Sequence, residues 1–372
     1  MLVAADAAGR GGFADLLVAG DLDELISRRA LRTPFLRVVK EGATLPASRY
    51  TRSAMVGSRK LDDLADPDRL FELYEDGATV VLQALHRSWP PLADFCRRLA
   101  AELGHPTQCN AYLTPPGSRG FDAHHDTHDV FVLQVDGTKR WKVYAPALPL
   151  PLRSQPSAAY AERGALLADD ATPLISTVLR PGDVLYLPRG YIHAAETNAD
   201  RSIHLTVGVQ ALTWYDILQD ALTLAADEEM FRETLGTDLE TAVPEFLRVA
   251  AKWVEGLPPD RIEELVRLRL ARSIPAEPVR VLAQADAVRR LHTGTPVRLR
   301  PGLSWSLSGD HDRVVLHLRD RDISMPAVVE QALRRVLDGP AVTAADLATP
   351  ELTVDDALVL LGRLLGERVL VG

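Results

Sequence analysis

The sequence predicts a mainly β domain, followed by an α-helical region and an α+β module at the C-terminal end. Three observations support this prediction. From about Asn110, short runs rich in β-branched and aromatic residues are separated by Pro-Gly, Asp-Gly and Arg-Gly pairs, which is typical of an all-β sandwich or barrel. Beyond Leu212 the apolar residues recur at helical spacing. The tail then alternates between strand-like and helix-like segments.

The first predicted domain covers residues 1–212. Its opening part mixes helical and loop signals, and two segments with apolar residues at helical spacing, 21–31 and 92–103, are predicted helices. The predicted strands follow in four runs: NAYLTPP, DVFVLQVDGTKRWKVYAP, STVLRPGDVLYLPRGYIHAAET and RSIHLTVGVQ. Each run has the composition of a strand and is bounded by residues that favour turns.

The second region, residues 213–274, is predicted to be helical throughout, and prolines at 275 and 278 suggest its end. In residues 275–372, two segments resemble strands (VRLRPGLSWSLSG and DRVVLHLRD), two resemble helices (AVVEQALRRVLDG and VDDALVLLGRLLGE), and ERVLVG resembles a final strand. Two helices with a strand pair favour a winged-helix-like module. The helix-like segments are acidic or neutral, so DNA binding is not expected.

Composition narrows the classes of protein. The chain has 372 residues, 47% of them hydrophobic and 25% charged, as in an ordinary globular protein. Two cysteines are too few for a disulfide framework or a cysteine zinc site, which predicts a cytoplasmic location. No apolar run is long enough to cross a membrane, and the first residues lack the features of a signal peptide. The net charge of −9 argues against general nucleic-acid binding.

The segment FDAHHDTHDVFVLQ, residues 121–134, contains the densest group of metal-ligand residues. If it is one strand, His124, Asp126 and His128 share a face, and His125 lies on the other. An imidazole and a carboxylate two residues apart can chelate one ion. A further histidine from a distant strand would complete the triad that leaves open positions on Fe(II). We predict His193 for that place, and we expect His125 and His128 to lie at the surface or around the ligands.

Two segments, NAYLTPPGSRGFDAHHDTHDVFVLQVDGTKRWKVYAP and PGDVLYLPRGYIHAAET, closely resemble the JmjC-type 2-oxoglutarate oxygenases of the ribosomal-oxygenase group, which are cupin-like protein hydroxylases. The resemblance covers about residues 13–212, and more weakly the helical region and the tail. It implies a double-stranded β-helix fold for the catalytic domain. For the later regions it implies dimerisation through the helices and a winged-helix domain.

The resemblance also implies roles for individual residues. His124, Asp126 and His193 match the iron ligands of the group. Lys139 in GTKRW matches the basic residue that pairs with the far carboxylate of 2-oxoglutarate, and we expect it on the strand after the one that carries the ligands. The cosubstrate-lining residues are matched by Asn110 and His204. The chain departs from many relatives at His125, where they have an aromatic residue.

Three functions fit these observations. The resemblance implies an Fe(II)- and 2-oxoglutarate-dependent oxygenase that hydroxylates a protein side chain, with arginine or histidine of a ribosomal protein as the target. The same chemistry on a small molecule or a biosynthetic peptide is the first alternative, since fold analogy is a weak guide to substrate. A non-catalytic metal-binding cupin that mediates partner interactions is the second. A homodimer is predicted through residues 213–274.

Overall fold

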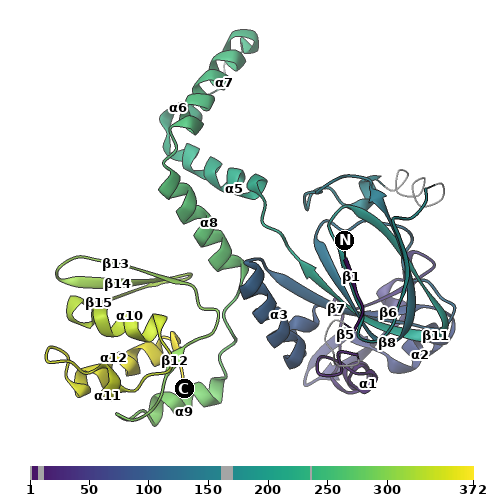
Figure 1. Cartoon of the computed structure of the whole chain (residues 1–372), viewed down its shortest axis with the longest axis horizontal. Coiled ribbons are helices and arrows are strands. Elements are labelled where there is room, and N and C mark those ends of the chain that lie inside the picture. The colour runs from purple at the N-terminus through teal and green to yellow at the C-terminus, as the bar shows by residue number, and fades with distance from the viewer. Residues whose placement is uncertain (1, 7–11, 161–170, 235–236) are drawn as a thin grey trace. The chain divides into compact units, whose positions relative to one another are not determined.

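The computed structural model describes residues 2–6, 12–160, 171–234 and 237–372. The chain divides into two compact units, residues 1–211 and 212–372. Figure 1 shows a β-rich first unit and a second unit in which helices dominate. The division falls beside the predicted boundary at residue 212. The separation of residues 213–274 from 275–372 as two domains stays a prediction.

One antiparallel sheet forms the frame of the first unit. Its strands follow the order β1-β10-β8-β11-β7-β6-β2-β3, and β9 pairs with β8. Their bounds are β1 (Leu2–Ala4), β2 (Leu36–Lys40), β3 (Ala43–Thr44), β6 (Thr79–Leu82), β7 (Thr107–Thr114), β8 (Asp129–Pro146), β9 (Ile175–Leu179), β10 (Val184–Leu187) and β11 (Tyr191–Val209). The mainly β prediction for this unit is therefore confirmed.

Alternation along β8 supplies side chains to two cores. Leu133 and Val135 belong to the larger core, which packs the sheet against the flanking helices, whereas Val130 and Val132 belong to a second core. Successive side chains of a strand point to opposite faces, so a run of apolar residues here means burial on both sides. The flanking elements are α1 (Ala19–Arg28), α2 (Pro67–Glu75), α3 (Pro90–Leu103) and the hairpin of β4 (Thr51–Val56) and β5 (Arg59–Ala65).

Three local predictions for this unit are wrong. The sheet does not start near Asn110, because β2 and β6 belong to it. The Asp136-Gly137 pair is not a hairpin turn, since β8 runs through it and Gly137 takes a positive φ of 61° within the strand. Residues 122–134 are not one strand, because β8 begins only at Asp129. Each error arises because partner strands distant in sequence decide where a strand begins and turns.

The second unit begins with helices α5 (Trp214–Ala221), α6 (Glu229–Arg232), α7 (Leu239–Glu255), α8 (Pro259–Ser273) and α9 (Val281–Arg289), of which α9 was not predicted. Its remaining elements are β12 (Arg298–Leu299), β13 (Trp305–Gly309), β14 (Arg313–Leu318), β15 (Asp322–Pro326), α10 (Glu330–Asp338), α11 (Ala344–Leu347), α12 (Val354–Gly366) and β16 (Leu370–Val371). A hydrophobic core drawn from residues 297–370 holds the last part together. Its description as a winged helix stays a prediction.

Among the helices of the described residues, none is both long and apolar enough to cross a membrane.

Candidate metal centre

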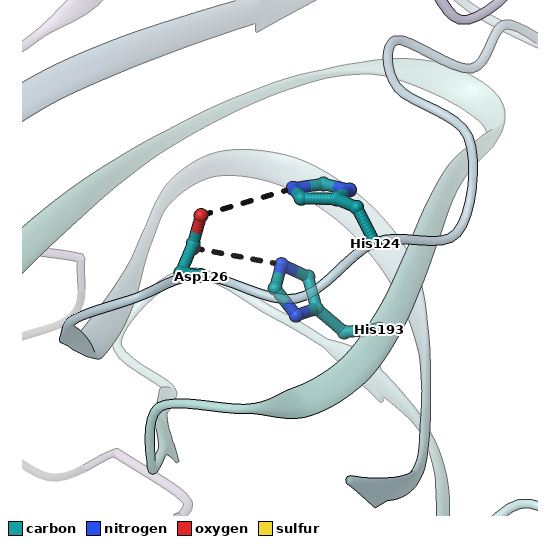
Figure 2. Close-up of side chains that lie close together, drawn as sticks. All are labelled: His124, Asp126 and His193. Carbon is teal, nitrogen blue, oxygen red and sulfur yellow. Dashed lines mark ion pairs between the residues drawn. The ribbon is translucent and has the colours of Figure 1, made fainter. Parts of the chain in front are cut away.

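Three predicted ligand residues lie together at one end of the sheet. His124, Asp126 and His193 each offer one ligand atom, and these atoms lie within 4.8 Å of one another. Nε2 of His124 is 4.0 Å from Oδ1 of Asp126, and Nε2 of His193 is 3.8 Å from Oδ2 of the same carboxylate. Figure 2 shows the two imidazoles on one side of the carboxylate, with all three side chains directed to a common point.

The backbone brings these side chains together without a continuous strand. His124 and His193 form an isolated antiparallel bridge, in which each amide donates to the carbonyl of the other residue, at 3.2 and 2.8 Å. The amide of Gly190 donates to the carbonyl of Asp126 at 2.9 Å. The loop before β8 is therefore held against the start of β11. This pairing, rather than the strand parity assumed from sequence, makes the ligands converge.

The electrostatics of the cluster suit a cation. Nδ1 of His124 lies 2.7 Å from the carbonyl of Asp122, and Nδ1 of His193 lies 3.1 Å from that of Tyr191. A Nδ1–H donated to each carbonyl leaves the Nε2 lone pairs free for a metal. Burial lowers the pKa of His193 to about 4. Burial would raise the pKa of Asp126, but His193 and His124 hold it below its usual value.

A pocket of about 340 Å³ opens onto the three ligands and also includes Lys139. Lys139 lies on β8, the strand that follows the ligand loop, and its side chain is only 4% exposed. Its Nζ donates to Oγ1 of Thr114 at 3.1 Å. No carboxylate forms an ion pair with it among the described residues. Burial lowers the pKa of Lys139 to about 7, because an unpaired ammonium in an apolar setting is costly.

The pocket wall contains nitrogen atoms that lack a partner. His204 stacks on Tyr112 with ring centroids 4.8 Å apart, and Trp141 meets its ring edge-on at 5.5 Å. Within the described part of the chain, Nδ1 of His204 and Nε1 of Trp141 are buried without a hydrogen-bond partner. Burial, and then the charge of Lys139, lower the pKa of His204 well below its usual value. Buried polar nitrogens without partners mark a place where a polar ligand fits.

Asn110 is placed differently from the other predicted residues. It lies on β7, and its side-chain oxygen accepts a hydrogen bond from the Ala84 amide at 2.9 Å. Among the described residues that line the pocket, Asn110 is absent, whereas Thr206, its partner in the β7–β11 register, is present. Its predicted contact with the cosubstrate stays a prediction.

Of the two remaining histidines of the cluster, His125 is buried and His128 is partly buried. His125 is 3% exposed, its amide donates to Oγ of Ser157 at 3.1 Å, and its ring lies against Tyr160. His128 packs closely against Gly208, where an added Cβ would lie 2.4 Å from the ring. Both therefore position the ligand loop against the rest of the unit.

Sequence reasoning missed several residues of the pocket. Arg37, Tyr112 and Trp141 line it together with Lys139. Trp141 could have been found, because it lies two residues after Lys139 and so points to the same face of a strand. Arg37 gave no sequence signal, since β2 lies in a part of the chain read as loop and helix.

Comparison with known proteins agrees with this geometry. Residues 86–217 match the JmjC domain family. Human ribosomal oxygenase 1 is 32% identical over 296 residues, which are 76% of this chain and 42% of that protein. The bifunctional lysine-specific demethylase and histidyl-hydroxylase NO66 of Drosophila persimilis is 35% identical over 175 residues, 47% of this chain and 24% of that protein. This chain thus spans less than half the length of these curated relatives.

A solved structure extends the likeness in fold to nearly the whole chain. YcfD, a ribosomal oxygenase from Escherichia coli in complex with cobalt and 2-oxoglutarate, superposes with a TM-score of 0.56 at 18% identity. The match covers 99% of this chain and 93% of YcfD. Residues 86–217, which include the histidine–aspartate–histidine cluster, therefore match a JmjC domain, and the chain is similar to the ribosomal oxygenases.

Proposed function

We propose that this chain is an Fe(II)- and 2-oxoglutarate-dependent oxygenase that hydroxylates a side chain of a polypeptide. The main observation behind the proposal is a single pocket that contains both the cluster of His124, Asp126 and His193 and the buried Lys139, which forms no ion pair with a carboxylate among the described residues. The first group suits a divalent metal with open positions. The second suits a dicarboxylate that reaches from the metal into the pocket.

The donor set fits iron. Two neutral imidazoles and one ionised carboxylate on one side of a centre are the ligands of non-haem Fe(II) oxygenases. His124 and His193 have their Nδ1 atoms beside backbone carbonyls, which holds their Nε2 atoms toward Asp126. We propose these three residues as the iron ligands.

The pocket also fits 2-oxoglutarate. Lys139 can give a charge-assisted bond to the far carboxylate, and Thr114 beside it supplies a hydroxyl. The unpartnered nitrogens of His204 and Trp141 lie on the same wall. The cobalt and 2-oxoglutarate bound by YcfD support this assignment. We retain Asn110 as a further contact, made after its side chain leaves the Ala84 amide.

With iron, 2-oxoglutarate and dioxygen bound, the chemistry yields succinate and carbon dioxide and places one oxygen atom in a substrate C–H bond. The residues of this chain bind and orient the reactants. Lys139 offsets the charge of the far carboxylate, and Val130, Val132 and Leu187 line the pocket with apolar surface that excludes water. Arg37 and Tyr112 line the same pocket from β2 and β7.

A ribosomal protein is the proposed substrate, with histidine or arginine as the target residue. The names of the relatives, ribosomal oxygenase and histidyl-hydroxylase, support this choice. A small molecule or a biosynthetic peptide is the alternative substrate, and a non-catalytic metal-binding cupin is the alternative function.

Two measurements test the proposal. Purified protein is mixed with Fe(II), 2-oxoglutarate and ribosomal proteins from cells that lack the gene, and succinate is quantified while mass spectrometry locates added oxygen. We expect succinate release that requires Fe(II), together with the gain of one oxygen atom on a single peptide. The absence of succinate release would indicate the non-catalytic alternative. Succinate without any modified ribosomal peptide would indicate another substrate.

We further propose a cytoplasmic homodimer. The exposed apolar side chains of α5 and α7 support an interface, since Trp214 is 83% exposed and Leu247 is 60% exposed.

Cys96 and Cys109 contact each other as free, buried thiols, which supports a reducing compartment. For the tail we propose a packing or substrate-docking role rather than DNA binding.

A further inference from the structure

Arg37 begins a row of side chains that crosses the sheet to the cosubstrate end of the pocket. The register places Arg37 of β2 opposite Val81 of β6, Val81 opposite Tyr112 of β7, and Tyr112 opposite His204 of β11. Residues paired in this way share one face of a sheet, and neighbouring strands lie about 4.8 Å apart. Arg37 and His204 are therefore at opposite ends of a row about 14 Å long.

The guanidinium of Arg37 lies over the ring of Phe121, which in turn lies beside a metal ligand. Its central carbon is 4.8 Å from the centroid of the Phe121 ring. That ring is in turn 5.5 Å from the ring of His124. Burial raises the pKa of the Tyr112 hydroxyl, which the Arg37 guanidinium lowers and the charge of Asp126 raises. A hydrogen bond with the Arg37 side chain also lowers this pKa, so Arg37 contacts Tyr112 as well as Phe121.

Arg37 has a hydrogen-bond donor that the described residues do not use. Its Nε is buried and has no partner among them. Among the described residues that line the pocket, Asp126 is the only carboxylate, and it belongs to the proposed ligand set. Arg37 and Lys139 are the cations of that lining. A buried donor without a partner, beside an excess of positive charge, favours a ligand that supplies a neutral or negative acceptor.

We propose that Arg37 determines which target residue the pocket accepts. Its guanidinium donates to a neutral acceptor on the substrate, an imidazole nitrogen or an amide oxygen, and repels a target side chain that is positively charged. The pocket therefore selects histidine over arginine. This inference rests on the proposed function, since it concerns the substrate side of the same site.

The experiment measures binding of small probes, so it does not require the natural substrate. The three probes are the N-acetyl methylamides of histidine, glutamine and arginine. The protein is loaded with Mn(II) and 2-oxoglutarate, and the paramagnetic broadening of each probe's side-chain protons is recorded by NMR. A Mn(II) titration gives the loaded fraction of every variant, so broadening is compared per loaded site. The glutamine probe controls for direct ligation of the metal by imidazole.

We expect the two neutral probes to broaden at least about tenfold more than the arginine probe in the wild-type protein, because like charges repel strongly in a partly desolvated pocket. In Arg37→Gln the difference should shrink to less than about threefold, and in Arg37→Glu the arginine probe should become preferred. The matched control is Arg119→Gln. The Arg119 guanidinium is exposed and lies 3.4 Å from Asp122, outside the described pocket lining, so the wild-type preference should remain.

Equal broadening of all three probes in the wild-type protein would overturn the proposal. So would an unchanged preference in both Arg37 variants, because that would limit Arg37 to structural contacts with Phe121 and Tyr112. These results are distinct from failure of the proposed function, which is judged by succinate release alone. A wild-type preference that reverses in Arg37→Glu supports the selection of neutral residues, whichever ribosomal protein carries the target.

Discussion

The rings of His124 and His193 are oriented by the same kind of local contact with a backbone carbonyl. In each case Nδ1 lies near the carbonyl of the residue two places earlier, Asp122 or Tyr191. This leaves both Nε2 atoms on the side of Asp126, within 4.0 Å of its oxygens. Ligands whose rings are fixed in advance bind a metal without losing much rotamer freedom. Both imidazoles therefore face the same carboxylate, that of Asp126.

Replacement of Asp126 by alanine should remove metal binding. Loss of residues that merely orient ligands costs about 10- to 100-fold in metal affinity, so loss of a ligand itself should cost more than about 100-fold. Calorimetric titration with Fe(II) or Co(II) and succinate release are the measurements. Asp122→Asn is the matched control, because the Asp122 side chain is exposed and pairs with Arg119. Metal affinity near the wild-type value in Asp126→Ala would contradict the assignment.

Lys139→Ala should weaken 2-oxoglutarate binding and leave metal binding intact. A charge-assisted hydrogen bond of about 1.5–3 kcal/mol corresponds to roughly a 10- to 100-fold increase in the apparent KM for 2-oxoglutarate. Steady-state succinate release gives the KM, and Co(II) titration gives the metal affinity. An unchanged KM would assign the carboxylate to another residue, with Arg140 as the first candidate.

Lys139 should also make cosubstrate binding depend on pH. Burial lowers its pKa to about 7 in the ligand-free protein, so the ammonium is present below pH 7 and is lost as the pH rises through that value. Its neighbours Thr114 and His204 add no charge there, since the pKa of His204 is held well below its usual value. The Kd for 2-oxoglutarate should therefore rise about tenfold for each pH unit above 7.

Lys139→Arg tests the cause of this pH dependence. A guanidinium stays charged up to about pH 12, so the variant should bind 2-oxoglutarate with a flat profile from about pH 6 to about pH 9. Isothermal titration over that range compares the two proteins. Equal slopes in the wild-type protein and the arginine variant would assign the titration to a different group.

Strand β8 connects the two functional parts of the pocket. Its first residues carry Val130 and Val132, and its later residues carry Lys139 and Trp141. Gly137 lies between them at φ 61°, opposite a register shift in β11 between Thr197 and Ser202. A Cβ at Gly137 would lie 1.8 Å from the carbonyl oxygen of Arg201. The close approach of β8 and β11 at this irregularity therefore requires glycine.

Gly137→Ala should destabilise the protein and disturb Lys139. Gly57 offers a matched control, because it has nearly the same φ, 58°, and no atom within 4 Å of an added Cβ. Gly57→Ala should cost about 1 kcal/mol for the left-handed backbone alone. Gly137→Ala should cost about 1–3 kcal/mol more, because β11 must move. Urea unfolding and the KM for 2-oxoglutarate are the measurements, and equal effects of the two substitutions would contradict the prediction.

At the scale of the whole molecule, each unit has its own hydrophobic core. The helices at the start of the second unit contribute few buried side chains and many exposed apolar ones. On α7, Leu239, Val243, Phe246, Leu247 and Val254 are exposed between 47% and 60%. An apolar surface of this kind favours association with another chain.

The protein should therefore be a dimer in solution. Light scattering at micromolar concentration should give a mass near twice the 40.7 kDa of one chain. Leu247→Glu should shift the mass toward one chain, because it places a charge within the proposed interface. Met55→Glu is the control, since Met55 is equally exposed but lies on the β4–β5 hairpin. A wild-type mass near that of one chain would contradict the dimer.

Much of the site could be predicted from the sequence, because its chemistry depends on residue types at short spacing. His124 and Asp126 lie two residues apart, His193 follows an Arg-Gly turn, and Lys139 lies within a clear strand pattern. The mainly β class and the helices between residues 213 and 274 follow from periodicity, which is also a local property. These are features that neighbouring residues determine among themselves.

The tertiary structure decided what depends on partners distant in sequence. Pairing of β2, β6, β7 and β11 sets Arg37 and His204 in one row, and no local pattern specifies that register. Asp136-Gly137 continues a strand instead of turning, because β11 pairs on both sides of it. The low pKa of Lys139 is likewise a consequence of burial. The residue types could be read from the sequence. Which of these side chains face one another was decided by long-range packing, because burial and strand register arise only when distant segments of the chain meet.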